Sequence, residues 1–425
     1  MDIPFKLLER CHVNKNSDGD HFVGIKADSD NAMVYFPIGY KLPKTEKDLR
    51  QDILHLISVI SGFTNRDDRV LATQKFAAPK FVDFPINTYM EIINYFMEQN
   101  GYYTEKEPKY KIGDSGKVDW EKTIRRQRPL ISNGSPIYTN CTVRYSSPND
   151  KNMITQIHKF CVYESFTKLG WLFTPYLPER PTIPRNDKMF LSVLRRKLAN
   201  TYNDKDKRIF LSMIAMIEFM ESSENQFYFG TDRFEYVWEK IIDRTFGIKE
   251  KKNYFPKTEW NLRTGKKSVN AALEPDTIML HNGKIYVLDA KYYRFGITGN
   301  PKHLPESSSI NKQITYGEYI HNQRFNGKTG DDVPVYNAFI MPYNAEDNPI
   351  DFSDIIANIG EATAKWKTVR NKYERVQGIV IDIRFLMFHY VGKPKDQIMR
   401  LAQSIESAFE VSGGHLPTDA ASVVV

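Results

Sequence analysis

Residues 273–293 read LEPDTIMLHNGKIYVLDAKYY and predict a β-hairpin. Residues 277–280 form one expected strand, and residues 284–290 form the returning strand. Between them stand Asn282 and Gly283, and an Asn-Gly pair is the strongest short signal for a two-residue hairpin turn. The stretch therefore places a tight antiparallel pair of strands in the C-terminal half of the chain.

Three charged residues mark this hairpin, which could be built from apolar residues alone. Side chains alternate along a strand, so Asp289 and Lys291 share one face, and the turn folds Asp276 back towards them. Burying such acids costs several kcal/mol unless something pairs with them. Hydrated Mg²⁺, with Mn²⁺ as a substitute, is a natural partner because it prefers carboxylate oxygens.

An ion held by these acids gives the hairpin a chemical role. It would lower the pKa of a bound water and neutralise charge on a phosphoryl oxygen, while the neighbouring Lys291 ammonium helps to orient or deprotonate the attacking water. This is the logic of metal-dependent phosphodiester hydrolysis. A salt-bridged hairpin with no catalytic role explains the three charged residues equally well.

The segment before the hairpin favours the catalytic interpretation. A helix is expected to be capped by Thr231 and to run to about Phe246. It carries Glu235 and Glu239, which are four residues apart and so lie on one helix face. Both carboxylates could therefore face the same ion.

The segments after the hairpin complete a recognisable order of elements. A helical stretch begins near Gln313, and residues 336–342 form a strand. Helix, hairpin, helix, strand is the order of the PD-(D/E)xK nuclease core. The predicted fold class is therefore α/β and α+β multidomain, with a C-terminal core of this type in which helices flank a mixed sheet.

Changes in pattern along the chain predict its domains. Residues 1–100 read as an N-terminal α+β domain for DNA recognition or partner docking, and 101–224 as a linking region with short strands and a helical middle. Residues 225–411 form the predicted nuclease domain, and 412–425 a flexible tail. The expected helices in the first two regions are 49–60, 89–97, 154–172, 189–202 and 205–221.

Composition excludes several classes of protein. The chain has 425 residues and a net charge of +7, which allows a polyanionic partner without establishing one. Its three cysteines include no CxxC pair, which excludes a disulfide framework and a cysteine zinc site. No run approaches the roughly 18 apolar residues of a membrane span, and the N-terminus lacks the pattern of a signal peptide. A soluble cytoplasmic protein without a membrane partner is expected.

Two basic runs stand out locally. Residues 106–128 hold eight Lys or Arg against four acids, and the run 249–267 reads as a loop. Both are interpreted as solvated faces, which are commoner than nucleic-acid patches; for residues 119–128, contact with a motor protein or DNA is an equal alternative. Three tryptophans, Trp120, Trp171 and Trp238, are expected to anchor the core.

Several motifs taken together resemble the LlaJI-type restriction endonucleases, which are the nuclease subunits of McrBC-like systems and are related in role to McrC. The resemblance covers roughly residues 103–345 and extends more weakly to 411. The motifs are GKVDWEKTIRRQRPLI, ITQIHKFCVYESFTKLGWLF, YFGTDRFEYVWEKII, EPDTIML, YVLDAKYY, NKQITYGEY and VYNAFIMPY.

The resemblance implies a metal-dependent endonuclease that cuts double-stranded DNA beside a separate McrB-like AAA+ GTPase. Such a system defends a prokaryotic cell against foreign DNA. Dimerisation on DNA is a reasonable expectation, because cutting both strands needs two active sites or one that resets. The site residues that it implies are Asp276, Asp289, Glu235 and the backbone carbonyl of Ala290 as metal ligands, Lys291 as the catalytic lysine, Gln313 as a supporting residue, and Glu239 as the second choice for the helix carboxylate.

Three alternatives remain open at the level of sequence. The first is a self-sufficient, site-specific type II endonuclease that reads its own target through residues 1–100. The second is a non-catalytic adaptor that activates an AAA+ motor and retains a nuclease fold. The third is a nuclease directed at RNA, because the metal chemistry does not require a deoxyribose.

Overall fold

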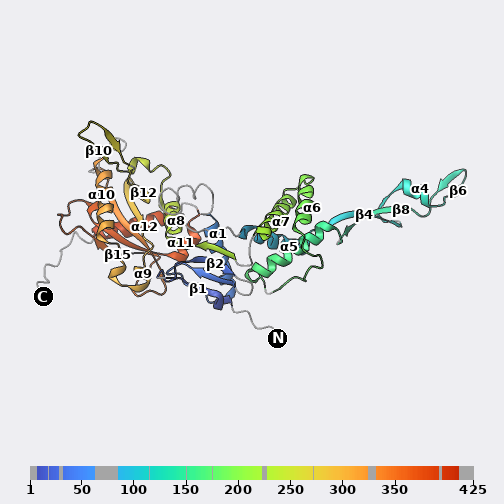
Figure 1. Ribbon diagram of the computed structural model, residues 1–425, viewed down its shortest axis with the longest axis horizontal. Helices are drawn as coiled ribbons and strands as arrows, with labels where there is room; N and C mark the ends of the chain where they lie inside the picture. The colour runs from blue at the N-terminus through green and yellow to red at the C-terminus, as the bar shows by residue number, and fades with distance from the viewer. Residues whose placement is uncertain are drawn as a thin grey trace. The chain divides into compact units, whose positions relative to one another are not determined.

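The chain divides into two units, and the first unit contains both the N-terminal and the C-terminal parts of the sequence (Figure 1). The first unit comprises Met1–Lys26, Asp30–Val82 and Tyr228–Val425, and the second comprises Ala27–Ser29 and Asp83–Phe227. This division differs from the predicted boundary at residue 100. The computed structural model describes residues 7–17, 19–27, 32–62, 85–113, 115–149, 151–174, 176–222, 227–270, 272–323, 332–391 and 395–410.

A five-stranded mixed sheet forms the centre of the first unit. The predicted hairpin is confirmed: β12 and β13 pair antiparallel from Thr277–Leu288 to His281–Lys284. Asn282 and Gly283 have φ of 48° and 73°, the left-handed conformations that a tight hairpin turn requires. Strands β13, β14 and β16 are parallel, and β15 is antiparallel to β16. The order is β12 (Thr277–His281), β13 (Lys284–Ala290), β14 (Val335–Tyr343), β16 (Val376–Asp382), β15 (Ile356–Ala362).

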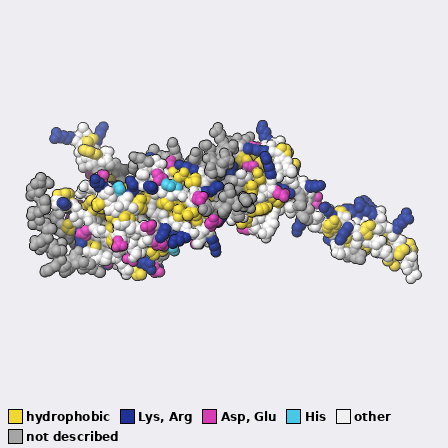
Figure 2. All heavy atoms as spheres, turned by 90° about the horizontal axis from the view of Figure 1, so that it is seen from below, with side chains coloured by type: hydrophobic (Ala, Val, Ile, Leu, Met, Phe, Trp, Pro, Cys, Tyr) yellow, Lys and Arg dark blue, Asp and Glu magenta, His cyan; other side chains and the backbone are white. Residues whose placement is uncertain are grey.

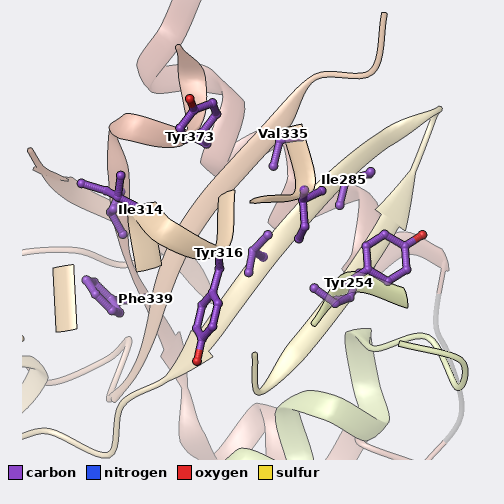
Figure 3. Close-up of a cluster of buried hydrophobic side chains, with 11 residues drawn as sticks. Tyr254, Ile285, Ile314, Tyr316, Val335, Phe339 and Tyr373 are labelled. Carbon is purple, nitrogen blue, oxygen red and sulfur yellow. The ribbon is translucent and has the colours of Figure 1, made fainter. Parts of the chain in front are cut away.

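Helices pack against this sheet. Helix α10 lies over one face, where Ile314 and Tyr316 join strand residues such as Ile285 and Phe339 in a buried apolar cluster (Figure 3). Helix α8, hairpin, α10 and β14 follow one another as predicted; assigning them to a PD-(D/E)xK core remains a prediction. The helices of this unit are α1 (Glu46–Gly62), α8 (Phe234–Phe246), α9 (Phe295–Thr298), α10 (Ser307–Asn322), α11 (Ile383–His389) and α12 (Lys395–Glu410).

A second sheet explains why the N-terminal residues belong to the first unit. Gly24 on β2 and Gly230 on β9 meet so closely that a Cβ at Gly24 would lie 2.1 Å from the Phe229 carbonyl oxygen. This long-range pairing carries the N-terminal strands to the start of α8, and no local pattern predicts it. The order is β1 (Cys11–Val13), β3 (Ala32–Phe36), β2 (Val23–Ala27), β9 (Phe227–Thr231).

The second unit combines a helical part with an extended arm, residues 105–149 (Figure 1). The helices are α3 (Ile86–Glu98), α5 (Met153–Leu169), α6 (Asp187–Ala199) and α7 (Asp204–Ser222). The arm contains β4 (Glu105–Ile112), β5 (Lys117–Val118), α4 (Trp120–Arg126), β6 (Leu130–Ser132), β7 (Ser135–Ile137) and β8 (Thr142–Asn149). In the described parts of either unit, no helix is long and apolar enough to cross a membrane.

Several local predictions need correction. Arg233, not Thr231, is the N-cap of α8; the Thr231 hydroxyl instead accepts a hydrogen bond from the Arg233 backbone N–H (3.0 Å). Trp238 is fully buried as expected, but Trp120 is 58% exposed because the short helix α4 lies in the arm. The basic run 249–267 is no loop, since it includes the hairpin of β10 (Glu259–Asn261) and β11 (Lys267–Val269). The predicted tail lies outside the described residues.

The five helices predicted in the first two regions are confirmed as α1, α3, α5, α6 and α7. On α5, the imidazole of His158 is fully buried, and its Nδ1 accepts a hydrogen bond from the Tyr103 backbone N–H (2.8 Å). Burial lowers the pKa of His158 to about 3, so this ring stays neutral in the folded chain. The unfolded chain takes up a proton near pH 6.5, so stability is lost as the pH falls from there towards 3.

We expect acid to destabilise the wild type more than His158→Gln. Between pH 7 and pH 5 the wild type should lose about 2 kcal/mol more unfolding free energy than the variant. Urea unfolding followed by circular dichroism at both pH values measures this difference. Equal losses in the two proteins would contradict the assignment of His158 as a buried neutral group.

Candidate functional site

Two carboxyl groups meet where the β12–β13 hairpin ends. The Asp276 Oδ2 accepts a hydrogen bond from the Ala290 backbone N–H (3.0 Å), which fixes Asp276 beside the end of β13. Asp289 is only 8% exposed. Burial raises the pKa of Asp276 well above its usual range, and the charges of Asp289 and Glu239 raise it further. The predicted convergence of the two acids is therefore present.

Lys291 completes the group on the same face of the strand. Its Nζ lies 2.7 Å from the Asp289 Oδ2, and both side chains are largely buried. Burial lowers the pKa of Lys291, but the Asp289 carboxylate outweighs that effect and the pKa is raised. The Lys291 backbone N–H donates to the Ile340 carbonyl (2.8 Å), which extends the β13–β14 pairing beyond Ala290. The lysine is thus held as an ammonium beside the two acids.

Helix α8 supplies two more carboxylates. The Trp238 indole anchors the helix by donating from Nε1 to the Ile340 carbonyl (3.2 Å). Glu239 is the residue whose charge acts on Asp276, whereas partial desolvation raises the pKa of Glu235 against the opposing charges of Arg233 and His21. This electrostatic interaction favours Glu239, the second choice from sequence, as the helix carboxylate that acts on Asp276.

These side chains line one pocket of about 650 Å³ in the first unit. It contains every predicted site residue except Gln313, together with residues that sequence reasoning missed. All of these except Asn16 and His21 lie in the motifs of the family resemblance, but nothing in the sequence marked them as pocket residues. The missed residues are Asn16, His21, Asp232, Arg233, Tyr236, Tyr292, Tyr293 and Lys312.

Gln313 lies beneath the pocket rather than in its lining. It is 1% exposed, and its Nε2 donates to the Val287 carbonyl (2.7 Å) on β13. The Asn337 side chain on β14 donates from Nδ2 to the backbone carbonyl of Gln313 (2.9 Å). Gln313 therefore holds α10 against β13 and β14, and any support it gives the site is exerted through strand β13.

The N-terminal segment supplies one wall of the pocket. Asn16 donates from Nδ2 to the Tyr292 carbonyl (3.2 Å), and its Oδ1 lies 2.9 Å from the His21 Nδ1. The Tyr292 hydroxyl in turn accepts from the Ile38 backbone N–H (2.8 Å). His21 thus enters the pocket through contacts between residues far apart in the chain, which no local sequence signal could reveal.

The donor set suits a hydrated divalent cation. Two adjacent carboxyl groups, Asp276 and Asp289, repel each other when ionised, and a cation relieves that repulsion. Mg²⁺ usually binds one or two carboxylates and keeps several waters. Within the described ranges, no three or more His, Cys, Asp or Glu side chains form a group that could hold a metal ion by themselves. An ion held by Asp276 and Asp289 alone would therefore keep most of its coordination positions for water.

Comparisons with known proteins bear on this site. The chain is 28% identical over 290 residues to the type II restriction enzyme BsuMI component YdjA of Bacillus subtilis, and the match spans 60% of each protein. Distant structural likenesses are to Thermococcus gammatolerans assemblies: McrB AAA+ hexamers with bound McrC (TM-score 0.37, 14% identity, 92% of this chain and 83% of that one) and the McrBC complex (0.22, 16%, 53% and 65%).

The family model of the LlaJI restriction endonuclease matches residues 22–359. This range contains the hairpin, both carboxylates of α8, Lys291 and Gln313. It also contains the second unit with its arm. The family predicted from the motifs is thus confirmed, and the chain belongs to the LlaJI restriction endonucleases.

Proposed function

We propose that the chain is the metal-dependent DNA endonuclease subunit of a restriction system, hydrolysing phosphodiester bonds of foreign DNA. The observation that carries this proposal is the assembly of Asp276, Asp289 and Lys291 at the end of the hairpin, in a pocket open to a ligand. Membership of the LlaJI restriction endonucleases supports it. The mixed sheet with α8 and α10 supports a PD-(D/E)xK core.

The site residues divide the work of hydrolysis. Asp276, Asp289 and the Ala290 carbonyl would hold Mg²⁺ or Mn²⁺, which supplies Lewis-acid stabilisation of charge on the phosphoryl group. Lys291, fixed by Asp289, donates hydrogen bonds to a phosphate oxygen or to the attacking water. Water adds to phosphorus and gives up a proton to the solvent, the P–O bond to the leaving sugar oxygen breaks, and that oxygen takes a proton from the solvent.

We further propose that an McrB-like AAA+ GTPase drives the nuclease and docks on the arm, and that the complex dimerises on DNA to cut both strands. The arm, residues 105–149, exposes several apolar side chains, because its short strands form too small a core to bury them. Exposed apolar side chains that lie together are typical of a surface that binds another protein. Figure 2 shows basic and hydrophobic side chains mixed along the arm. The exposed apolar side chains are Ile112, Trp120, Ile124, Leu130, Ile131 and Ile137.

A self-sufficient type II endonuclease is the second candidate. The curated relative from Bacillus subtilis is named as a component of a type II restriction enzyme. A component implies further subunits, which fits a partnered nuclease as well. Cleavage of plasmid by the purified chain alone would favour this candidate over the motor-coupled enzyme.

Plasmid cleavage tests the proposal. The purified chain is incubated with supercoiled DNA and Mg²⁺, with and without its genomically adjacent GTPase and GTP. We expect nicked and linear products that disappear with EDTA and in Asp276→Asn, and that depend on GTP. No cleavage of either modified or unmodified DNA would overturn the proposal in favour of a non-catalytic adaptor.

The two carboxylates of α8 are expected to differ in their effect. Because the charge of Glu239 acts on Asp276, Glu239→Gln should slow cleavage by about 10–100-fold. Glu235→Gln changes the same type of residue one helical turn away, and should slow cleavage less than about threefold. Rates measured at saturating Mg²⁺ decide between them, and the opposite order would return the role to Glu235.

A further inference from the structure

The exposed hairpin of β10 and β11 belongs to the first unit and projects from it (Figure 1). Every residue described in the range 257–270 is exposed. Trp260 and Val269 are 63% and 65% exposed, although residues of these types normally avoid water. A two-stranded hairpin without a packed face is marginal by itself. Its surface is therefore suited to a partner.

The charge of this hairpin identifies the class of partner. Four basic residues, Lys257, Arg263, Lys266 and Lys267, stand against one acid, Glu259. Three of the four lie at or beside the turn, which Gly265 closes with a φ of 79° and a backbone hydrogen bond to Leu262 (2.9 Å). A basic tip beside an exposed indole is complementary in charge to a polyanion. An uncharged apolar partner would leave these basic side chains without counter-charges.

The base of the hairpin is fastened to the proposed active site. The Leu273 backbone N–H donates to the Pro256 carbonyl (2.8 Å), three residues before Asp276. Lys251, just before the hairpin, bonds through Nζ to the Asp243 carboxylate (2.9 Å) and to the Asp276 carbonyl. A backbone hydrogen bond therefore ties the base of the hairpin to a residue close in sequence to the first carboxylate.

The dimensions of the hairpin fit duplex DNA. The segment from Pro256 to the turn at Arg263 contains strand β10 and can span at most roughly 23 Å, at about 3.3 Å per residue. A two-stranded ribbon enters the major groove of B-form DNA, which is about 12 Å wide. The deep, narrow major groove of A-form RNA does not admit side chains in this way.

We propose that the β10–β11 hairpin binds duplex DNA in the major groove beside the cleavage site. This inference rests on the proposed function, because it takes the Asp276 pocket as the place where the DNA is cut. Arg263, Lys266 and Lys267 contact phosphates, and Trp260 packs against the groove. The hairpin sets where the backbone lies relative to Asp276, so it contributes to the choice of the bond that is cut.

Binding of a fluorescent DNA duplex tests the hairpin, using the full chain with Lys291→Ala so that the DNA stays intact in Mg²⁺. Adding Lys266→Glu and Lys267→Glu should weaken binding at least about tenfold. It should also flatten the slope of log K against log salt by about 2, the loss of two phosphate contacts. The control Lys44→Glu with Lys47→Glu makes the same charge change at exposed sites of the first unit and should weaken binding less than threefold.

The outcomes separate this inference from the proposed function. Hairpin variants that bind like the control, while the wild type still cuts, overturn the inference alone. Hairpin-dependent binding by a wild type that never cuts overturns the proposed function and leaves only the binding of DNA by the hairpin. An equal loss of binding to an RNA duplex of the same sequence would overturn the assignment to the major groove, and Trp260→Ala should weaken DNA binding without changing the salt slope.

Discussion

Lys291→Ala is expected to slow DNA cleavage by about a thousandfold while the chain stays folded. The lost ammonium is the donor fixed 2.7 Å from Asp289, and removing one such preorganised donor costs about 10²–10³ in rate, with proton transfer adding to that. Plasmid cleavage with Mg²⁺, the GTPase and GTP measures the rate. Circular dichroism melting of the same preparations checks the fold.

Lys284→Ala is the matched control for that experiment. Lys284 lies at the other end of β13, where its Nζ pairs with the Glu406 Oε2 on α12 (2.6 Å). The pair is only partly exposed (31% and 20%), but Lys284 does not line the pocket of the candidate site, so this variant should cut DNA at nearly the wild-type rate while it stays folded. If Lys291→Ala cuts as fast as Lys284→Ala, the charged hairpin is only a salt bridge and the catalytic assignment fails.

The hairpin could be predicted because its determinants are local. Positive φ at Asn282 and Gly283 is a property of those two residues, and strand alternation then fixes which side chains share a face with Asp289. The order of helix, hairpin, helix and strand follows from the same kind of local periodicity. Sequence reasoning was therefore sufficient to bring Asp276, Asp289 and Lys291 together.

The pocket wall could not be predicted because its determinants are distant. His21 reaches the site through the pairing of β2 with β9 and through Asn16, whose bond to Tyr292 spans 276 residues. Because of the same long-range contacts, the N-terminal strands and α1 belong to the first unit, whereas α3 belongs to the second. Periodicity identifies such elements but carries no information on their partners.

The direction of individual side chains also could not be predicted from the sequence. Gln313 and Lys312 are neighbours on α10, yet the lysine lines the pocket and the glutamine is buried against Val287. Glu235 and Glu239 share a helix face, but only the charge of Glu239 acts on Asp276. Spacing places both glutamates on one helix face, but it does not say which of them acts on Asp276.

Arg384→Ala is expected to lower the free energy of unfolding by about 3 kcal/mol. Asp52 on α1 is 1% exposed, and Arg384 on α11 binds it through Nε to Oδ2 (2.7 Å) and Nη2 to Oδ1 (2.9 Å). The variant leaves Asp52 with the Tyr40 hydroxyl (2.9 Å) as its remaining hydrogen-bond donor among those described, so a buried carboxylate loses its counter-charge. Urea unfolding followed by circular dichroism at pH 7 measures the loss.

Lys41→Ala is the control, because Lys41 and Glu346 link the same N-terminal and C-terminal parts of the first unit through an exposed pair (2.6 Å). It should cost less than about 1 kcal/mol. Adding Asp52→Asn to Arg384→Ala should restore part of the loss, since the amide is neutral and still accepts from Tyr40. If Arg384→Ala lowers the free energy of unfolding no more than Lys41→Ala does, the buried pair does not hold the N-terminal segment, and the pocket wall with it, to the sheet.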